Sequence, residues 1–327
     1  MIIVGTVVGK RVKYRTVLQL AMACAFIGGV LPFVWHGSFA AVLISRAVFG
    51  LGIGGIGCRN ALIIVSFEPE NRAKYIGIGI FLSNVCGVCM QFVSGWLADI
   101  NVWYAFLVYA IALVPFVLIT LFLREPEYES EANTAREKIT VAPRVWLYVI
   151  IGLLWCILGY SIMTNMSSFV QMRGLGDAGV SGIILSLYTL GGALGGAAAS
   201  KLYRSLKRFF VPFAFAVAAA GEALVLVGTN IPLVAIGTAL AGFAWFALDT
   251  YLISFTGAVS TPASTPLCTS IVLAATQVGV FLSSYACAAL GLAFTNTVVA
   301  SKYMAITGFG ICAVVFSVWD VRPESMR

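Results

Sequence analysis

The chain has 327 residues, of which 61% are hydrophobic and 10% charged, and its formal net charge is +7. A soluble globular domain usually carries about 25% charged residues, so these side chains cannot coat a water-soluble surface, and a cytosolic enzyme is excluded. A membrane span needs about 20 apolar residues, and the apolar runs here are much longer than the alternating strands of an outer-membrane barrel. The composition predicts an all-α, polytopic membrane protein.

Ten complete membrane spans are predicted when the apolar runs are divided at charged or Pro- and Gly-containing breaks. In chain order they cover residues 16–36, 38–65, 75–98, 103–123, 146–171, 178–200, 209–229, 231–256, 266–292 and 297–319. Residues 1–9 are apolar but too short to cross a bilayer. We expect them to be the end of a helix whose beginning is absent from this sequence.

A polar segment at residues 124–144 separates the fourth predicted span from the fifth. Its composition predicts a solvated linker between an N-terminal bundle at 1–123 and a C-terminal six-helix bundle at 145–327. Most Lys and Arg residues fall on the linker's side of the predicted spans, whereas Arg173 and Lys302 fall on the other side. The positive-inside rule therefore places the linker and the C-terminus in the cytoplasm. The same rule accounts for the net charge without a nucleic-acid partner.

Two stretches far apart in the chain share a glycine followed by basic residues at matching positions. One contains Gly5, Lys10 and Lys13, and the other contains Gly196, Lys201 and Arg204. Two spans later in each half comes a glycine-rich helix, after Arg46 in the first half and at residues 237–242 in the second. Internal repeats can decide a fold. This one predicts a parallel duplication, with chance similarity between basic loops as the alternative.

The first of these loops resembles a motif of the major facilitator superfamily of secondary transporters. The family's loop between helices two and three carries Gly-x-x-x-Asp-Arg-x-Gly-Arg-Lys. Gly5, Lys10 and Lys13 match this pattern, whereas Gly9 and Val12 replace its Asp and its second Gly. The second loop echoes the pattern, as it does in the family.

Two further motifs extend the resemblance along the chain. Arg46 followed by Gly50 is similar to the family's helix-four pattern, and residues 69–72 are similar to its loop between helices four and five. The resemblance implies two six-helix bundles in parallel repeat. It also implies that the ten predicted spans are family helices three to twelve, so that the first helix and most of the second are absent.

Three ionisable side chains inside predicted spans are candidates for proton coupling or for a charged cavity: Arg46, Glu222 and Asp249. A charge near a helix centre costs about 2.5–3.5 kcal/mol on insertion scales, so such residues are functional hypotheses by default. Arg46 shares a helix face with Gly50 and Asn60, and the glycines should allow a neighbouring helix to approach closely. The resemblance links Arg46 to proton coupling. A structural anchor bonded to backbone carbonyls is the alternative.

Asp249 is the first choice for proton coupling or for binding a cationic group of a solute. It shares a face with Trp245 on a helix that borders the central cavity in the resembled family. An apolar cavity disfavours the charged form of an aspartate, which suits reversible protonation, although a static ion pair remains open. Glu222 lies on a helix that is peripheral in that family, so packing against a neighbouring helix is its alternative role.

Polar residues that repeat along three predicted helices indicate a solute cavity. Amide and hydroxyl groups gain nothing from facing lipid, so each stripe is expected to face protein or water. Interhelical hydrogen bonding is the alternative for any single stripe. The predicted cavity residues are Asn60, Asn84, Gln91, Tyr160, Thr164, Ser168, Trp245, Gln277 and Tyr285.

These observations predict a secondary active transporter that moves a small organic solute by alternating access. The aromatic and Met-rich lining favours proton-coupled efflux by an antiporter; a proton-coupled uptake symporter and an inactive truncated transporter are the alternatives. His36 is the only histidine, so no histidine-based active site, no metal site and no cofactor is expected. The expected partners are the solute, protons and the lipid bilayer of the cell inner membrane, which the protein should cross as a monomer.

Overall fold

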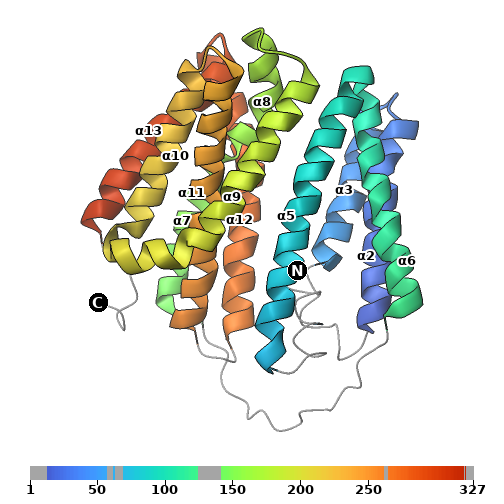
Figure 1. The fold of residues 1–327 in the computed structure, drawn as a ribbon, viewed down its shortest axis with the longest axis horizontal. Coiled ribbons are helices and arrows are strands. Elements are labelled where there is room, and N and C mark those ends of the chain that lie inside the picture. Colours follow the sequence, from blue (N-terminus) through green and yellow to red (C-terminus); the bar gives the residue numbers. More distant parts are fainter. Residues whose placement is uncertain are drawn as a thin grey trace. The chain divides into compact units, whose positions relative to one another are not determined.

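The computed structural model describes residues 13–56, 62, 69–123, 141–260, 264–319 and 321. Throughout these ranges the regular secondary structure is helical, as the composition predicts. The chain forms two compact units, Met1–Arg136 and Glu137–Arg327, whose helices run from blue to teal and from green to red in Figure 1. The boundary between the two units falls within the polar segment that was predicted to be a linker.

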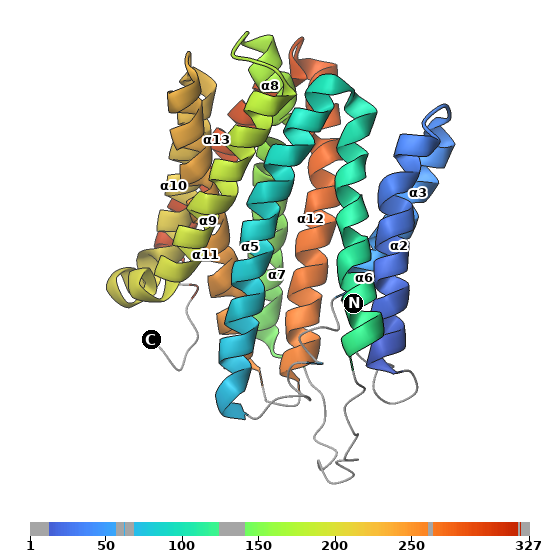
Figure 2. The ribbon, with the colours of Figure 1, turned by 45° about the vertical axis from the view of Figure 1, so that its right-hand side comes forward.

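In the N-terminal unit, α2 packs closely on α3. The described helices of this unit are α2 (Tyr14–Val34), α3 (Phe39–Ile56), α5 (Pro69–Ile100), the 3-10 helix η1 (Val102–Ala112) and α6 (Leu113–Phe122). α2 lies beside α3 and α6 in both views (Figures 1 and 2). A Cβ added at Gly52 would meet the carbonyl oxygen of Ala21, and one added at Gly28 would meet the backbone of Phe49. Glycine therefore sets the short distance between these two helices.

The glycine face of α3 differs from the predicted one. Gly50 was expected at a close helix contact, but it is exposed, and nothing lies within 4 Å of a Cβ added there. Gly52 and Gly55 make the close contacts with α2 instead. Glycines are spaced along α3 in a way that suits either face, so only the position of the neighbouring helix decides between them.

η1 is an unusually long 3-10 helix. Its 11 residues follow a cap at Asn101, whose side chain accepts a hydrogen bond from the Trp103 backbone N–H at 2.9 Å, whereas 3-10 runs beyond about 3–4 residues are uncommon. Residues three apart are eclipsed in this winding. Trp103, Phe106 and Tyr109 therefore form one column, with successive ring centroids 6.0 and 6.5 Å apart, and His36 stacks on Trp103 with ring centroids 4.6 Å apart.

The C-terminal unit is a second helical bundle. Its described helices are α7 (Pro143–Gly159), α8 (Ser161–Met172), α9 (Ala178–Leu206), the short 3-10 helix η2 (Lys207–Phe209), α10 (Phe210–Val227), α11 (Ile231–Val259), α12 (Thr265–Ala293) and α13 (Thr297–Val318). Asn230 and Asn296 cap α11 and α13 by accepting hydrogen bonds from the third backbone N–H of each helix, which satisfies a donor that the helix leaves unpaired.

α9 and α11 approach each other through glycine. A Cβ added at Gly195 would meet the carbonyl oxygen of Phe243, and one added at Gly242 would meet that of Tyr188. Small residues at such a crossing replace side-chain contacts by backbone contacts. This close crossing holds Tyr188 of α9 beside the residues of α11 that are described below.

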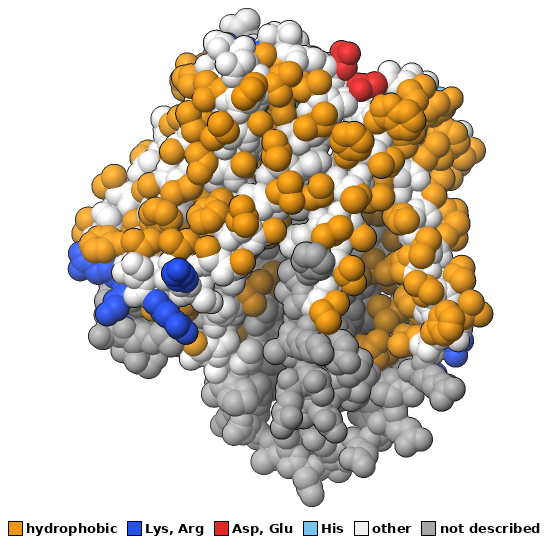
Figure 3. All heavy atoms as spheres, in the orientation of Figure 1, with side chains coloured by type: hydrophobic (Ala, Val, Ile, Leu, Met, Phe, Trp, Pro, Cys, Tyr) orange, Lys and Arg blue, Asp and Glu red, His pale blue; other side chains and the backbone are white. Residues whose placement is uncertain are grey.

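Eight helical stretches in the described residues are long and apolar enough to cross a membrane. One of them, Ala178–Val227, contains both α9 and α10, and α5, which overlaps the predicted span 75–98, is not among the eight. Ten complete spans therefore remain a prediction. Figure 3 shows hydrophobic side chains along the helices, with Lys and Arg gathered near the turn between α9 and α10, as expected for helices that cross a bilayer.

Candidate functional site

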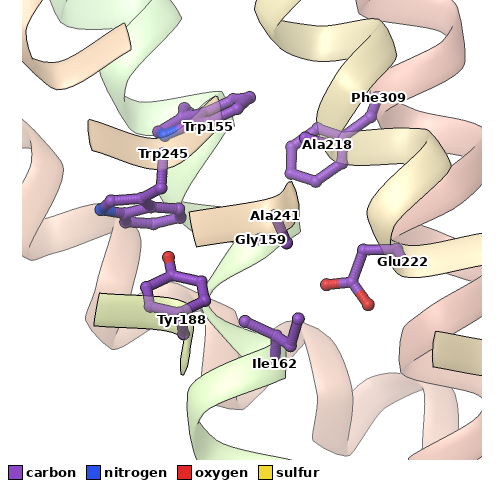
Figure 4. A pocket seen from close by; sticks show the side chains of 9 residues that line it. All are labelled: Trp155, Gly159, Ile162, Tyr188, Ala218, Glu222, Ala241, Trp245 and Phe309. Carbon is purple, nitrogen blue, oxygen red and sulfur yellow. The ribbon is translucent and has the colours of Figure 1, made fainter. Parts of the chain in front are cut away.

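A small cavity in the C-terminal unit is lined by residues of α7, α8, α9, α10, α11 and α13 (Figure 4). Its volume is about 10 Å³, enough for about one water molecule, so it is too small for an organic solute. Trp155, Trp245 and Phe309 form aromatic walls, and Glu222 and Tyr188 lie on opposite sides with the Glu222 carboxylate pointing inward. The cavity is an apolar chamber with one charged group at its edge.

That charged group is half of a buried ion pair. Glu222 Oε2 of α10 lies 3.0 Å from Lys302 Nζ of α13, and the two side chains are 1% and 0% exposed. Removing two charges from water costs several kcal/mol per ion, which only a close partner offsets. Glu222 therefore packs against a neighbouring helix, as its alternative role predicts, and it does so through a charge.

The structure adds to what the sequence shows of Lys302, which was counted among the basic residues on the side opposite the linker. Its side chain is fully buried on α13. The chain offered a signal for this: Lys302 lies inside an apolar run after the cap at Asn296, as Glu222 lies inside another. Two opposite charges within apolar runs are candidates for each other's partner.

Neutral polar side chains extend the pair towards α8 and α12. Asn165 Nδ2 of α8 donates a hydrogen bond to Ser301 Oγ at 3.3 Å, and it lies 4.0 Å from Cys287 Sγ of α12. Ser301 is fully buried next to Lys302 in the chain. The sequence analysis missed Asn165, although an amide inside an apolar span was a sufficient reason to single it out.

The predicted polar stripe of this segment lies on another face of α8. Thr164 and Ser168 are exposed, and Tyr160, at the junction of α7 and α8, is partly buried with its ring centroid 6.3 Å from that of Trp245. Periodicity identified residues that share a face. It did not show that the buried face of α8 carries Asn165 instead.

Asp249 has no ionic partner among the described residues. It lies on α11, partly buried, and its carboxylate accepts a hydrogen bond from the side chain of Trp245 one turn earlier. The static ion pair considered for Asp249 is not formed within the described chain. Trp245 thus connects Asp249 to the cavity, whose wall it forms.

Arg46 is held by backbone and aromatic groups of the N-terminal unit. Its guanidinium donates hydrogen bonds to the carbonyl oxygens of Gly28 and, at 3.0 Å, Gly29. The guanidinium carbon also lies 5.1, 5.0 and 5.2 Å from the ring centroids of Phe49, Phe106 and Tyr109. These contacts join α2, α3 and η1, which matches the anchoring interpretation of this residue.

The remaining cavity candidates do not converge on the small chamber. Asn84 and Gln91 are partly buried on α5, whereas Gln277 and Tyr285 are exposed on α12. Asn60 lies outside the described residues. Within the described ranges, no group of three or more His, Cys, Asp and Glu side chains is arranged to hold a metal ion.

The basic motif of the second repeat is helical where a loop was expected. α9 continues to Leu206, so Lys201 and Arg204 lie exposed in its last turns. The helix dipole stabilises cations at this end of a helix. Gly196 is partly buried in the same helix. Of the first repeat, Lys13 is exposed at the start of α2, and Gly5 and Lys10 lie outside the described residues.

Comparison with known proteins places the chain among membrane transporters. A family model described as the Major Facilitator Superfamily matches residues 1–284. The chain is 25% identical over 147 residues to the MFS thioclapurine efflux transporter tcpA of Claviceps purpurea (strain 20.1), and this match covers 44% of the chain and only 27% of that protein.

Two solved structures show the same fold. The crystal structure of a D-xylose-proton symporter matches with a TM-score of 0.70 and 15% identity, covering 99% of this chain and 84% of the other. A bacterial homolog of the human lysosomal transporter Spinster, inward-facing and unoccupied, matches with a TM-score of 0.68 and 16% identity, covering 97% and 83%. At these identities the similarity concerns the fold.

Proposed function

The chain belongs to the Major Facilitator Superfamily of secondary transporters, and we propose that it exports a small organic solute in exchange for protons. As a member of this family it is a transporter and not an enzyme. Export is supported by the activity that the curated relative carries in its name. Alternating access of two helical bundles around a site near the midplane is the mechanism that suits this fold.

The proposal of proton coupling rests on the surroundings of the Asp249 carboxylate. A carboxylate inside a membrane span is costly when charged, and this one has a neutral hydrogen-bond donor, Trp245, and no cation as its partner within the described chain. Binding a proton removes the charge, and releasing the proton restores it. Such a group can link the movement of a proton to a conformational change whose two states differ in how well they solvate the carboxylate.

The predicted cavity residues are proposed to contact the solute. Thr164, Ser168, Gln277 and Tyr285 are exposed on the C-terminal unit, which leaves their polar groups available to a ligand. Asn84 and Gln91 on α5 are the corresponding candidates of the N-terminal unit, and the set is completed by Asn60, Tyr160 and Trp245. The buried chamber around Glu222 is proposed to serve stability, because its volume excludes a solute.

Orientation and span number follow from the sequence. We place residues 124–144 and the C-terminus in the cytoplasm, supported by the basic residues at the end of α9 and in η2. Ten spans, with α9 and α10 as separate crossings and α5 as another, fit the helices better than eight. The direction of transport is then outward from the side that carries these basic residues.

Transport driven by a pH gradient tests this function. We expect purified protein in proteoliposomes to move at least one of three aromatic dyes, namely cationic ethidium, neutral Nile red or anionic fluorescein, and to accumulate it only while a gradient is imposed. Asp249→Asn keeps the size and hydrogen bonding of the side chain but cannot be protonated, so it should abolish gradient-driven accumulation and retain dye exchange at equal pH.

Asp177→Asn is the matched control for this variant. Asp177 is the exposed residue before α9, and its side chain makes no capping hydrogen bond, so this substitution should leave transport unchanged. Equal gradient-driven accumulation by Asp249→Asn and the unaltered protein would show that Asp249 does not carry the proton.

A further inference from the structure

The two carboxylates buried in the C-terminal unit have different partners. We propose that Lys302 keeps Glu222 ionised throughout the transport cycle, so that Asp249 and not Glu222 carries the coupling proton. This inference rests on the proposed function, because it states which carboxylate takes up the proton during export.

The geometry of the Lys302–Glu222 pair opposes protonation of Glu222. The two charged atoms lie 3.0 Å apart, and both side chains are almost completely shielded from solvent. A proton on Glu222 would cancel its charge and leave the Lys302 ammonium buried without a counter-ion. An unpaired buried charge is far less favourable than a buried pair, so contact with Lys302 opposes protonation of Glu222.

The groups around the pair do not replace either partner. Tyr188 of α9 and Cys287 of α12 are close enough to Glu222 to interact with it electrostatically, but phenols and thiols are ordinarily neutral near pH 7. Asn165 of α8 adds a neutral amide beside Cys287. Within the described ranges, no other acidic or basic side chain forms an ion pair with Glu222 or with its partner.

Asp249 is in the opposite situation. Its hydrogen-bond donor is the indole of Trp245, and the ionisable groups that interact with it electrostatically, Cys156 and Tyr188, are ordinarily neutral near pH 7. A proton on Asp249 removes a poorly solvated charge and leaves no cation unpaired. The same physical rule that opposes protonation of Glu222 therefore favours protonation of Asp249.

A double variant without the pair tests this assignment. Glu222→Leu combined with Lys302→Met replaces both charges by apolar side chains, a change that buried ion pairs often tolerate. In proteoliposomes with an imposed pH gradient, we expect the double variant to accumulate the dye that the unaltered protein transports, within about twofold of its rate. Adding Asp249→Asn to the double variant should abolish this accumulation.

The single variant Lys302→Met tests whether Lys302 keeps Glu222 ionised. It leaves Glu222 without its cation, so Glu222 should bind a proton of its own, and a second titration step should appear in the pH profile of dye exchange. The double variant should return this profile to one step. If the single variant does not fold, gradient-driven accumulation by the double variant is sufficient to test the assignment. If the double variant does not fold, the swapped pair Glu222→Lys with Lys302→Glu provides the same test.

The contrary outcome is equally specific. A double variant or swapped pair that exchanges dye but ignores the pH gradient would mean that Glu222 carries the proton, and the inference would be wrong. Failure of the unaltered protein to use a pH gradient is a different result, because it would reject the proposed proton-coupled export itself.

Discussion

Arg46 in the N-terminal unit and Lys302 in the C-terminal unit are two intramembrane cations that are stabilised in different ways. Arg46 is held by two backbone carbonyl oxygens and three aromatic rings, whereas Lys302 is held by one carboxylate. The planar guanidinium has several donors and stacks on rings, while the ammonium is a compact charge that needs a counter-ion. The comparison teaches that a buried charge in this chain is a functional candidate only after its partner is known.

Removing one member of the Lys302–Glu222 pair tests how much the buried ion pair contributes to stability. Lys302→Met leaves the buried Glu222 carboxyl group without its counter-ion and should destabilise the protein by about 3–5 kcal/mol. Thermal unfolding in detergent, followed by tryptophan fluorescence, should show a large fall in Tm. Lys201→Met, at an exposed position of α9, is the control and should change Tm very little. A small loss for Lys302→Met would show that the pair contributes little.

Exchanging the Arg46 guanidinium for an ammonium tests how much its contacts with carbonyl oxygens and aromatic rings contribute to stability. Arg46→Lys keeps the charge but loses the fork that reaches the Gly28 and Gly29 carbonyls and the stacking on the rings, so we expect a loss of about 1–3 kcal/mol. Arg204→Lys, an exposed position near the end of α9, should be neutral in the same unfolding assay. Equal stability of Arg46→Lys and the unaltered protein would mean that charge alone anchors Arg46.

Two glycines of α3 sharpen the comparison further, because the Arg46 contacts depend on how closely α3 approaches α2. Gly52→Ala would place a Cβ against the backbone of α2 and should destabilise the protein by about 1–2 kcal/mol. Gly50→Ala has open space around it and should stabilise α3 by about 0.5–1 kcal/mol, since Ala has the higher helix propensity. Opposite signs in the unfolding assay are expected, and equal signs would contradict this account of the contact.

Composition was enough to predict the helical membrane fold, because hydropathy is a local property of the chain. Family membership also followed from local motifs such as Arg46 with Gly50. Their places in apolar runs make Lys302 and Glu222 candidate partners, but the contact itself could not be predicted, since it depends on how α10 and α13 pack. The polar stripe at Thr164 and Ser168 failed to locate the buried amide for a related reason: periodicity groups residues by face but does not say which face is buried.

The winding of η1 has a mechanical consequence. A 3-10 helix rises about 2.0 Å per residue and an α-helix about 1.5 Å, so rewinding its 11 residues as an α-helix would shorten the segment by about 5 Å. The same rewinding would turn the column of Trp103, Phe106 and Tyr109 into a spiral, because residues three apart are no longer eclipsed. Phe106 and Tyr109 also contact the Arg46 guanidinium, so the same rewinding would change the positions of both rings relative to it.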